Sequence, residues 1–353
     1  MNAEFFEAIA MIEREKGIPQ EFMLEKIEQA LVAAYRRTHE SAEHVSVTCD
    51  ETSKEIRMSL QKDVVATEDD VMDDENEISL EAAQRIVPGA QVGDRVSLDV
   101  DMKSFGRIAA QTAKQVIIQG IREAERGMIY REFNSKSQEI LNCLVSRVDP
   151  NSGAAVLEVT GSSSPRNELR LFPGEQIPGE HLREGQRIKV YVVEVQQLTR
   201  GPQVMISRTH PGLVRRLFEL EVPEIHDGVV EVMSVSREPG SRTKLAVRAL
   251  EEGIDPIGAC IGPRGSRVNA VVEELAGEKI DIVLYSEDPA AYVAAALAPA
   301  DVLRVTMEGE KVCRVIVPDD QLSLAIGKEG QNARLAARLT GYKIDIKPAS
   351  FEG

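Results

Sequence analysis

Cysteine is scarce in this 353-residue sequence, and its four cysteines are far apart with no Cys-x-x-Cys pair. This spacing predicts neither a metal site nor a disulfide framework, and it indicates reduced thiols. Long apolar runs are also lacking: the longest uncharged one, Ala290 to Ala298, is about half of the ~20 residues that a membrane-spanning helix needs. Glu4 and Glu7 stand where a secretion signal carries positive charge, so we expect a cytoplasmic protein with no membrane partner.

Residues that could form a catalytic site are not grouped either. The five histidines show no metal-ligand spacing. Gly327-Lys328-Glu329-Gly330 is not a phosphate-binding P-loop, because its lysine is followed by glutamate and not by serine or threonine. We therefore expect no enzyme activity, no cofactor and no metal ion.

Positive charge is in the minority, with 42 Lys and Arg against 58 Asp and Glu and a net charge of -16. That total alone would argue against a nucleic-acid partner. The acids are unevenly distributed, because residues 1–134 hold 27 acidic against 16 basic residues, whereas residues 135–200 hold 8 of each. The densest acidic run, Glu68 to Glu77, is either a solvated face that aids solubility or a docking surface for a basic partner.

The first third predicts a helical and β-stranded domain. Helical spacing of apolar residues indicates one helix around Phe5 to Ile12 and a second around Leu24 to Tyr35, with Gly17 and Pro19 between them. Strands are expected at Val45 to Thr48 and Glu55 to Val65.

A long helix is then predicted from Phe105 to Met128, with Ser104 as its N-cap. At 1.5 Å per residue it would be ~40 Å long, so we expect it to connect the first domain to the next.

Residues 139–207 change to short β-type runs separated by turn-forming residues, including a turn at Thr199 to Pro202. Five such strands suit a small barrel of the OB type, whose open face commonly binds oligonucleotides. Phe172 and Tyr191 are its only aromatic residues, so base stacking is limited and we expect the barrel to position RNA rather than grip it. The expected strands are Ile140–Val148, Ala155–Val159, Glu168–Phe172, Ile188–Val195 and Val204–Ser207.

An internal repeat is the most informative feature. Ala259 to Gly265 recurs sixty-five positions later as Leu324 to Gly330, and Gly277 to Ile282 recurs as Gly341 to Ile346. Each copy has an apolar helical run, a Gly-x-x-Gly loop, a second helix and a Lys-Ile-Asp-Ile strand. A hairpin is expected before each helix pair, with its turn at Ser236 to Arg242 in the first copy and at Glu308-Gly309 in the second.

This layout resembles the KH fold, in which the glycine loop clamps about four nucleotides of single-stranded RNA. Glycines let the backbone approach the sugar-phosphate chain, and the amides that begin the next helix face phosphate oxygens. Arg264, Arg267 and Lys328 would add positive charge there, whereas Glu329 would oppose it. The predicted RNA-binding residues are Ile261, Gly262, Pro263, Arg264, Gly265, Ser266, Arg267, Ile326, Gly327, Lys328, Glu329, Gly330, Gln331, Asn332 and Arg334.

Taken together, the chain resembles the NusA family of bacterial transcription elongation and termination factors over nearly its whole length. The strings that carry the resemblance are Arg107 to Gln115, Ser207 to Pro211, Glu238 to Lys244, Asp255 to Cys260 and Ala325 to Arg334. The resemblance implies a multidomain α+β protein. Its expected parts are a polymerase-binding domain with the long helix (1–134), an OB-type RNA-binding barrel (135–207), and two tandem bacterial-type KH domains (208–284 and 285–353).

The resemblance also implies partners. Residues 1–134 are expected to dock on RNA polymerase near the RNA exit channel, at the flap of the β subunit, while the remainder holds nascent single-stranded RNA. The implied outcome is control of pausing, intrinsic termination and, with other Nus factors, antitermination by a monomeric protein.

Two other classes of protein contain the same KH and OB-type domains. A phosphorolytic ribonuclease would need a larger catalytic core than residues 1–134 provide. A translation-side RNA-binding protein or RNA chaperone remains the alternative, although a ribosomal partner would favour a basic first domain.

Overall fold

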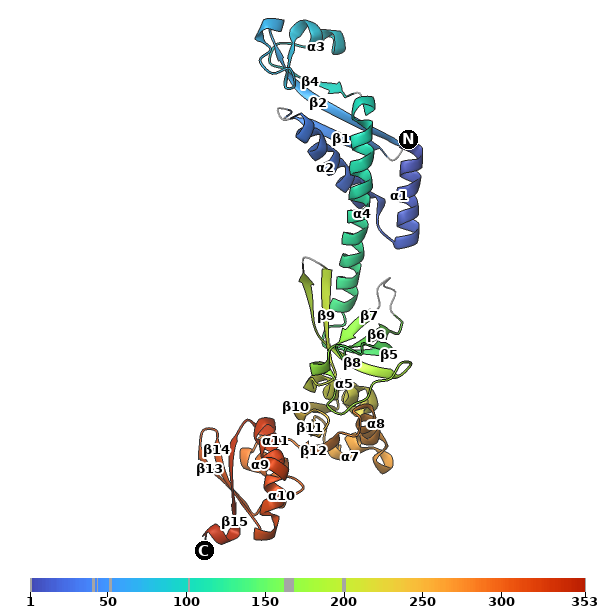
Figure 1. Cartoon of the computed structure of the whole chain (residues 1–353). Coiled ribbons are helices and arrows are strands. Elements are labelled where there is room, and N and C mark those ends of the chain that lie inside the picture. The colour runs from blue at the N-terminus through green and yellow to red at the C-terminus, as the bar shows by residue number, and fades with distance from the viewer. Residues whose placement is uncertain are drawn as a thin grey trace. The chain divides into compact units, whose positions relative to one another are not determined.

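The computed structural model describes residues 2–39, 42, 44–50, 53–100, 102–161, 168–198 and 201–352 (Figure 1). It divides into two compact units, Met1–Met128 and Ile129–Gly353. Within the described ranges, no helix is long and apolar enough to cross a membrane. No group of three or more His, Cys, Asp and Glu side chains there could hold a metal ion.

The first unit combines helices with a four-stranded sheet. Strand β2 pairs antiparallel with β1 and β4 and parallel with the short β3. Its elements are α1 (Asn2–Lys16), α2 (Gln20–Thr38), β1 (Val45–Asp50), β2 (Glu55–Val65), β3 (Glu77–Ser79), α3 (Leu80–Ile86), β4 (Arg95–Asp99) and most of α4 (Met102–Asn134).

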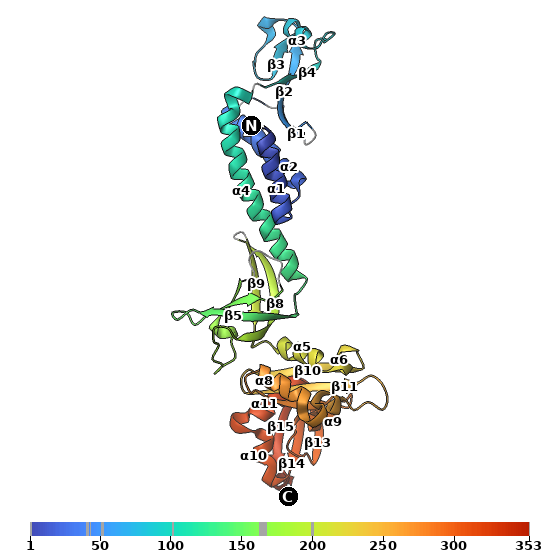
Figure 2. The same ribbon diagram turned by 90° about the vertical axis from the view of Figure 1, so that its right-hand side faces the viewer.

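One core holds this unit together. Figure 2 shows α1 and α2 side by side along α4, and their apolar faces meet β1 and β2 around Ile9, Ile27 and Met58, which are almost fully buried. The two predicted helices and two predicted strands are confirmed. The predicted N-cap is wrong, because α4 begins at Met102 and Ser104 lies inside it. The elements β3, α3 and β4 were not predicted.

Carboxylates of the acidic run Glu68 to Glu77 accept hydrogen bonds from backbone amides of the same loop. Glu77 accepts the backbone N–H groups of Met72 and Asp73, and Asp70 accepts that of Thr67. Glu68, Asp69, Asp70 and Asp74 remain exposed, as expected for a solvated face.

The second unit begins with a five-stranded sheet in the order β7-β6-β5-β8-β9. Its edge strands β7 and β9 contact each other, so the sheet curls into the nearly closed barrel that was predicted. Phe133, near the end of α4, is fully buried in its core. The strands are β5 (Ile140–Val148), β6 (Ala155–Val159), β7 (Glu168–Leu171), β8 (Arg187–Leu198) and β9 (Gly201–Ser207). Gly201 and Pro202 therefore belong to β9 and not to the predicted turn; Thr199 and Arg200 lie outside the described residues.

Two KH units follow, each with a three-stranded sheet. In both, the first two strands are antiparallel and the third joins parallel to the second, which confirms the predicted bacterial variant. The first contains α5 (Pro211–Glu221), α6 (Pro223–His226), β10 (Val230–Glu238), β11 (Arg242–Ala249), α7 (Pro256–Ile261), α8 (Ser266–Glu274) and β12 (Lys279–Leu284). The second contains α9 (Pro289–Ala296), β13 (Arg304–Gly309), β14 (Val312–Val317), α10 (Leu322–Ile326), α11 (Gln331–Thr340) and β15 (Lys343–Pro348).

Both predicted hairpin turns need correction. In the first unit the strands extend to Glu238 and from Arg242, so the turn is shorter than predicted. In the second unit Glu308 and Gly309 end β13, and the turn lies at Glu310-Lys311.

Candidate nucleic-acid interface

The two glycine loops have the same backbone conformation. The left-handed φ of the third loop residue is 53° at both Arg264 and Glu329, a conformation that side chains rarely adopt. The flanking glycines match equally well: φ is 73° at Gly262 and 75° at Gly327, and 77° at Gly265 and 74° at Gly330. The two copies of the repeated sequence therefore form loops with the same backbone geometry.

The first glycine of each loop is required by internal packing. A Cβ on Gly262 would lie 2.6 Å from Cγ of Arg267, and one on Gly327 would lie 2.8 Å from Cβ of Asn332. These positions cannot accept a side chain without moving the helix that follows. The first glycine of each loop thus allows a close contact between the loop and the next helix of the same protein.

The second glycine has more space. A Cβ on Gly265 would meet only the Asn269 side chain, at 3.2 Å, and one on Gly330 would meet only Arg334, at 3.9 Å. Both glycines have a left-handed conformation and directly precede α8 and α11. Amides at a helix start attract anions, although those of Ser266 and Gln331 already donate to the carbonyls of Pro263 and Lys328.

The cationic side chains near the loops differ in their availability. Arg264 and Lys328 are exposed and form no ion pair with any residue that the structure describes. Arg267 instead donates from Nη1 to the Glu224 carboxylate at 2.8 Å and to the Ala259 carbonyl at 2.6 Å. Its guanidinium fixes α7 and α6 around the first loop.

The other predicted site residues also include both exposed and buried side chains. Ile261 and Ile326 are 39% and 37% exposed, and so offer an apolar surface beside each loop. Pro263, Ser266 and Glu329 are exposed as well. Asn332 is buried and donates from Nδ2 to the carbonyls of Leu297 and Ala325, so it acts inside the second unit.

The first KH sheet is covered on both faces. One face packs against α5, α7 and α8, whereas Ala246 and Val283 on the other face share a core with Tyr292 and Val293 of α9. Helix α11 lies along β10 and β11, and Ser234 donates to the Leu339 carbonyl at 3.0 Å. The two KH units therefore pack together, as the short link between them predicted.

A buried lysine reinforces this packing. The fully buried Lys244 on β11 donates to Asp281 at 3.0 Å and to the Ala298 carbonyl, just after α9, at 2.8 Å. Burial lowers the pKa of Lys244. Burial alone would raise the pKa of Asp281, but the hydrogen bond from Arg242 and the charge of Lys244 lower it.

Three parts of the chain match known domain families. Residues 4–127 match the NusA N-terminal domain, residues 208–285 the NusA-like first KH domain, and residues 289–351 the NusA-like second KH domain. The transcription termination/antitermination protein NusA of Bacillus subtilis is 52% identical over 98% of this chain and 91% of its own length. The NusA protein of Halalkalibacterium halodurans is 52% identical over 99% and 89%, and that of Thermus thermophilus 40% over 99% and 91%.

The chain belongs to the NusA family. The resemblance inferred from the sequence is confirmed, and with it a role in transcription termination and antitermination. This family consists of transcription factors and not enzymes, so the prediction of a non-enzyme is confirmed by membership.

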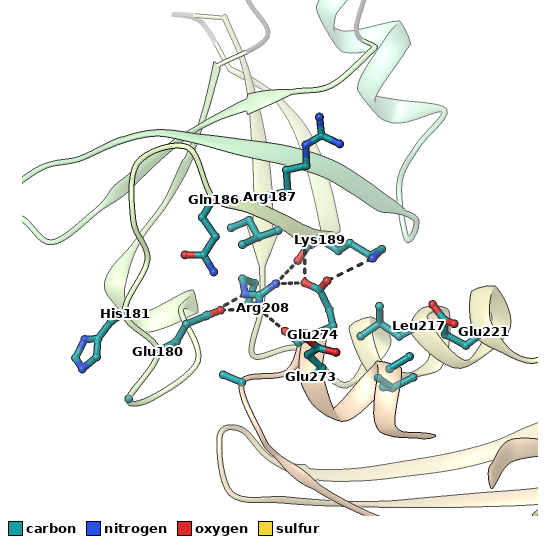
Figure 3. A pocket seen from close by; sticks show the side chains of 15 residues that line it. Glu180, His181, Gln186, Arg187, Lys189, Arg208, Leu217, Glu221, Glu273 and Glu274 are labelled. Carbon is teal, nitrogen blue, oxygen red and sulfur yellow. Dashed lines mark hydrogen bonds and ion pairs between the residues drawn. The ribbon is translucent and has the colours of Figure 1, made fainter. Parts of the chain in front are cut away.

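In this NusA-family chain one buried arginine joins the barrel to the first KH unit (Figure 3). Arg208 is 1% exposed and uses all five of its N–H groups. Nε and Nη2 donate to the Glu180 carboxylate, Nη1 to Glu274 and the Lys189 carbonyl, and Nη2 also to the Glu274 carbonyl, at 2.6–2.9 Å. Glu180 and Lys189 belong to the barrel and Glu274 ends α8, so these contacts fix the two parts together beside a cavity of about 600 Å³.

The aromatic residues of the barrel have different surroundings. Tyr191 is buried and stacks on His210, with ring centroids 4.8 Å apart and an interplanar angle of 5°. Phe172 is 54% exposed. A base could therefore stack only on Phe172 among the barrel's two aromatic rings.

The residues that make these long-range contacts were not predicted. Arg208 lies in a string that carries the family resemblance, but the sequence indicates no role for it. Glu224 was not singled out at all. Their partners are distant in sequence, and no local pattern signals such pairs.

Proposed function

We propose that the tandem KH units hold nascent single-stranded RNA in their two glycine loops, while residues 1–134 attach the protein to RNA polymerase at the β-subunit flap near the RNA exit channel. The matched loop geometry on two packed KH units is the observation that supports RNA binding. Exposed Arg264 and Lys328 and the positive N-terminal ends of α8 and α11 supply the phosphate contacts.

The proposal also covers the barrel, the oligomeric state and the partners of the protein. The barrel positions RNA, with Phe172 as its one exposed ring. The protein acts as a cytoplasmic monomer, and other Nus factors join it in antitermination. RNA polymerase and RNA are its partners, and no cofactor takes part.

Replacing both second glycines by aspartate tests RNA binding. Gly265→Asp with Gly330→Asp adds a negative charge at each loop and about 1–2 kcal/mol of left-handed backbone strain per site. Binding of single-stranded RNA, measured by fluorescence anisotropy, should fall at least tenfold, since two carboxylates then oppose the phosphates.

The control is Gly228→Asp with Gly253→Asp. Both glycines have a positive φ, and a Cβ on either would meet nothing within 4 Å, so the strain and charge are matched away from the loops. RNA binding equal to that of the control, in a variant with the same melting temperature, would refute the proposal.

A further inference from the structure

The first KH unit supplies a carboxylate to the loop region of the second. Glu238 ends β10, and its Oε1 accepts a hydrogen bond from Nε of Arg334 at 2.6 Å. Its Oε2 accepts one from Nε2 of Gln331 at 2.9 Å, and Nη1 of Arg338 is 3.8 Å from Oε1. The three α11 residues occupy one helix face, because they are three and four positions apart. One carboxylate therefore contacts the face of α11 that begins at the second loop.

Arg334 transmits this contact to the loop itself. Its Nη1 donates to the Glu329 carbonyl at 3.1 Å. Two of the five guanidinium N–H groups are thus used, and three remain on a side chain that is 42% exposed. The arginine is fixed at two points beside the loop and can still bind a phosphate.

The two loops differ in the charges in and beside them. Where the first loop has the exposed cation Arg264, the second has the acid Glu329. The residue equivalent to Arg334 in the first unit is Asn269, which carries no charge. The second loop also carries Lys328, but Glu329 cancels its charge, so Arg334 supplies the net positive charge beside that loop.

We propose that Glu238 is a positioning residue for RNA binding by the second KH loop, holding Arg334 where its free N–H groups meet a phosphate. The inference rests on the proposed RNA-binding function. Without Glu238, the long arginine side chain must be ordered when RNA binds, and that ordering costs binding free energy.

Docking of α11 does not depend on Glu238 alone. Gln331 also donates to Ser241 at 2.7 Å, and Lys244 and Ser234 hold the second unit at other points. A substitution at Glu238 should therefore release Arg334 without separating the KH units.

The test compares Glu238→Ala with Glu238→Gln. Both remove one negative charge, which by itself strengthens binding of a polyanion at low salt. Glutamine keeps an oxygen that can accept from Arg334, whereas alanine does not, so the ratio of their affinities isolates positioning. We expect the alanine variant to bind single-stranded RNA about fivefold more weakly than the glutamine variant, the order expected for ordering one long side chain. Its slope of log K against log salt should equal that of the glutamine variant, because Arg334 still contacts the phosphate once it is ordered.

Three further substitutions separate failure of the positioning role from failure of the proposed function. With Gly330→Asp already present, the alanine and glutamine variants should bind equally, whereas with Gly265→Asp the fivefold difference should persist. Glu231→Ala removes a carboxylate from the same hairpin, where it pairs with Arg248, and should change RNA binding only through this general charge effect. Equal affinities of the two Glu238 variants in the otherwise unchanged protein would overturn the positioning role. If Gly265→Asp and Gly330→Asp together also left RNA binding intact, the proposed function itself would fail.

Discussion

Nη2 of Arg237 lies 2.9 Å from the Glu278 carboxylate, and both side chains are fully buried. Nε of Arg237 also donates to Glu278, while its Nη1 donates to the His210 carbonyl. Glu278 accepts from the Gly240 amide and the Thr243 hydroxyl as well. The pair therefore joins the β10–β11 hairpin to the residue just before β12 and to the start of α5.

Glu278→Gln should destabilise the protein by about 3–5 kcal/mol, because it leaves a buried guanidinium without its counter-charge. Urea unfolding followed by circular dichroism measures this loss. Glu231→Gln is the control: Glu231 and Arg248 form an exposed pair, for which a loss of about 0–1 kcal/mol is expected. Similar losses in the two variants would contradict the buried-pair argument.

Arg208→Lys should uncouple the barrel from the first KH unit. A lysine has three donors in place of five and cannot reach Glu180 and Glu274 together in the same geometry. We expect thermal unfolding to separate into distinct transitions for the barrel and the KH pair. Arg216→Lys is the control, since Arg216 also joins α5 to the barrel through the Gln138 carbonyl but is about one-third exposed. A single transition in both variants would show that other contacts suffice.

RNA affinity should fall with salt at a slope of about -3, because each phosphate neutralised on a single strand contributes about 0.7 and about four contacts are expected. Arg264→Ala and Lys328→Ala should each reduce this slope by about 0.7. Arg267→Ala should lower the melting temperature, because Arg267 is bound to Glu224 and Ala259, and it should change the slope less. The reverse order of effects would show that Arg267 binds phosphate.

Stability should decrease below about pH 6.5, in part through His210. Burial lowers the pKa of His210 against the opposing charge of Glu175, and the charge of Arg237 lowers it further. Nδ1 of His210 accepts the Gly212 amide at the start of α5. Between the lowered folded pKa and the unfolded value of about 6.5, the unfolded chain binds more protons, so stability is complete above this window and is lost as the pH falls through it. His210→Asn keeps a capping side chain but does not titrate. The difference in unfolding free energy between the variant and the unsubstituted protein should therefore depend on pH only below about 6.5.

Attachment to polymerase should be a property of the first fragment. Residues 1–134 are expected to retain RNA polymerase in a pull-down, and residues 129–353 to bind RNA without it. The fragments overlap because Phe133 belongs to the barrel core, so a second fragment that began at residue 135 would lack that side chain. Retention of polymerase by residues 129–353 alone would move the docking surface to the RNA-binding half.

Periodic features of the sequence predicted most of the fold. The apolar spacing of α1 and α2, the alternating strands of the barrel and the repeated glycine loops each reflect local backbone preferences that a short window reveals. Elements with weak periodicity, such as β3 and α3, escaped prediction because their few apolar residues pack on a small core around Val64 and Val96.

The chemistry of the site was less predictable than its location. Arg264 and Arg267 are equivalent in the sequence as cations beside a glycine loop, yet one is exposed and the other is bound to Glu224, 43 residues away. Glu238 and Arg334 are 96 residues apart. The first pair is set by packing within the first KH unit and the second by packing between the two KH units, and local residue patterns encode neither.

The cover that α9 and α11 provide for the first KH sheet has a consequence for synthesis of the chain. Strands β10, β11 and β12 leave the ribosomal exit tunnel before α9 and α11, so the apolar face with Ala246 and Val283 emerges before its partners do. This second face of the first KH sheet can be covered only after the second unit has emerged. A nascent chain halted when residue 285 has just left the exit tunnel should consequently be more sensitive to protease than one halted after residue 353 has left it.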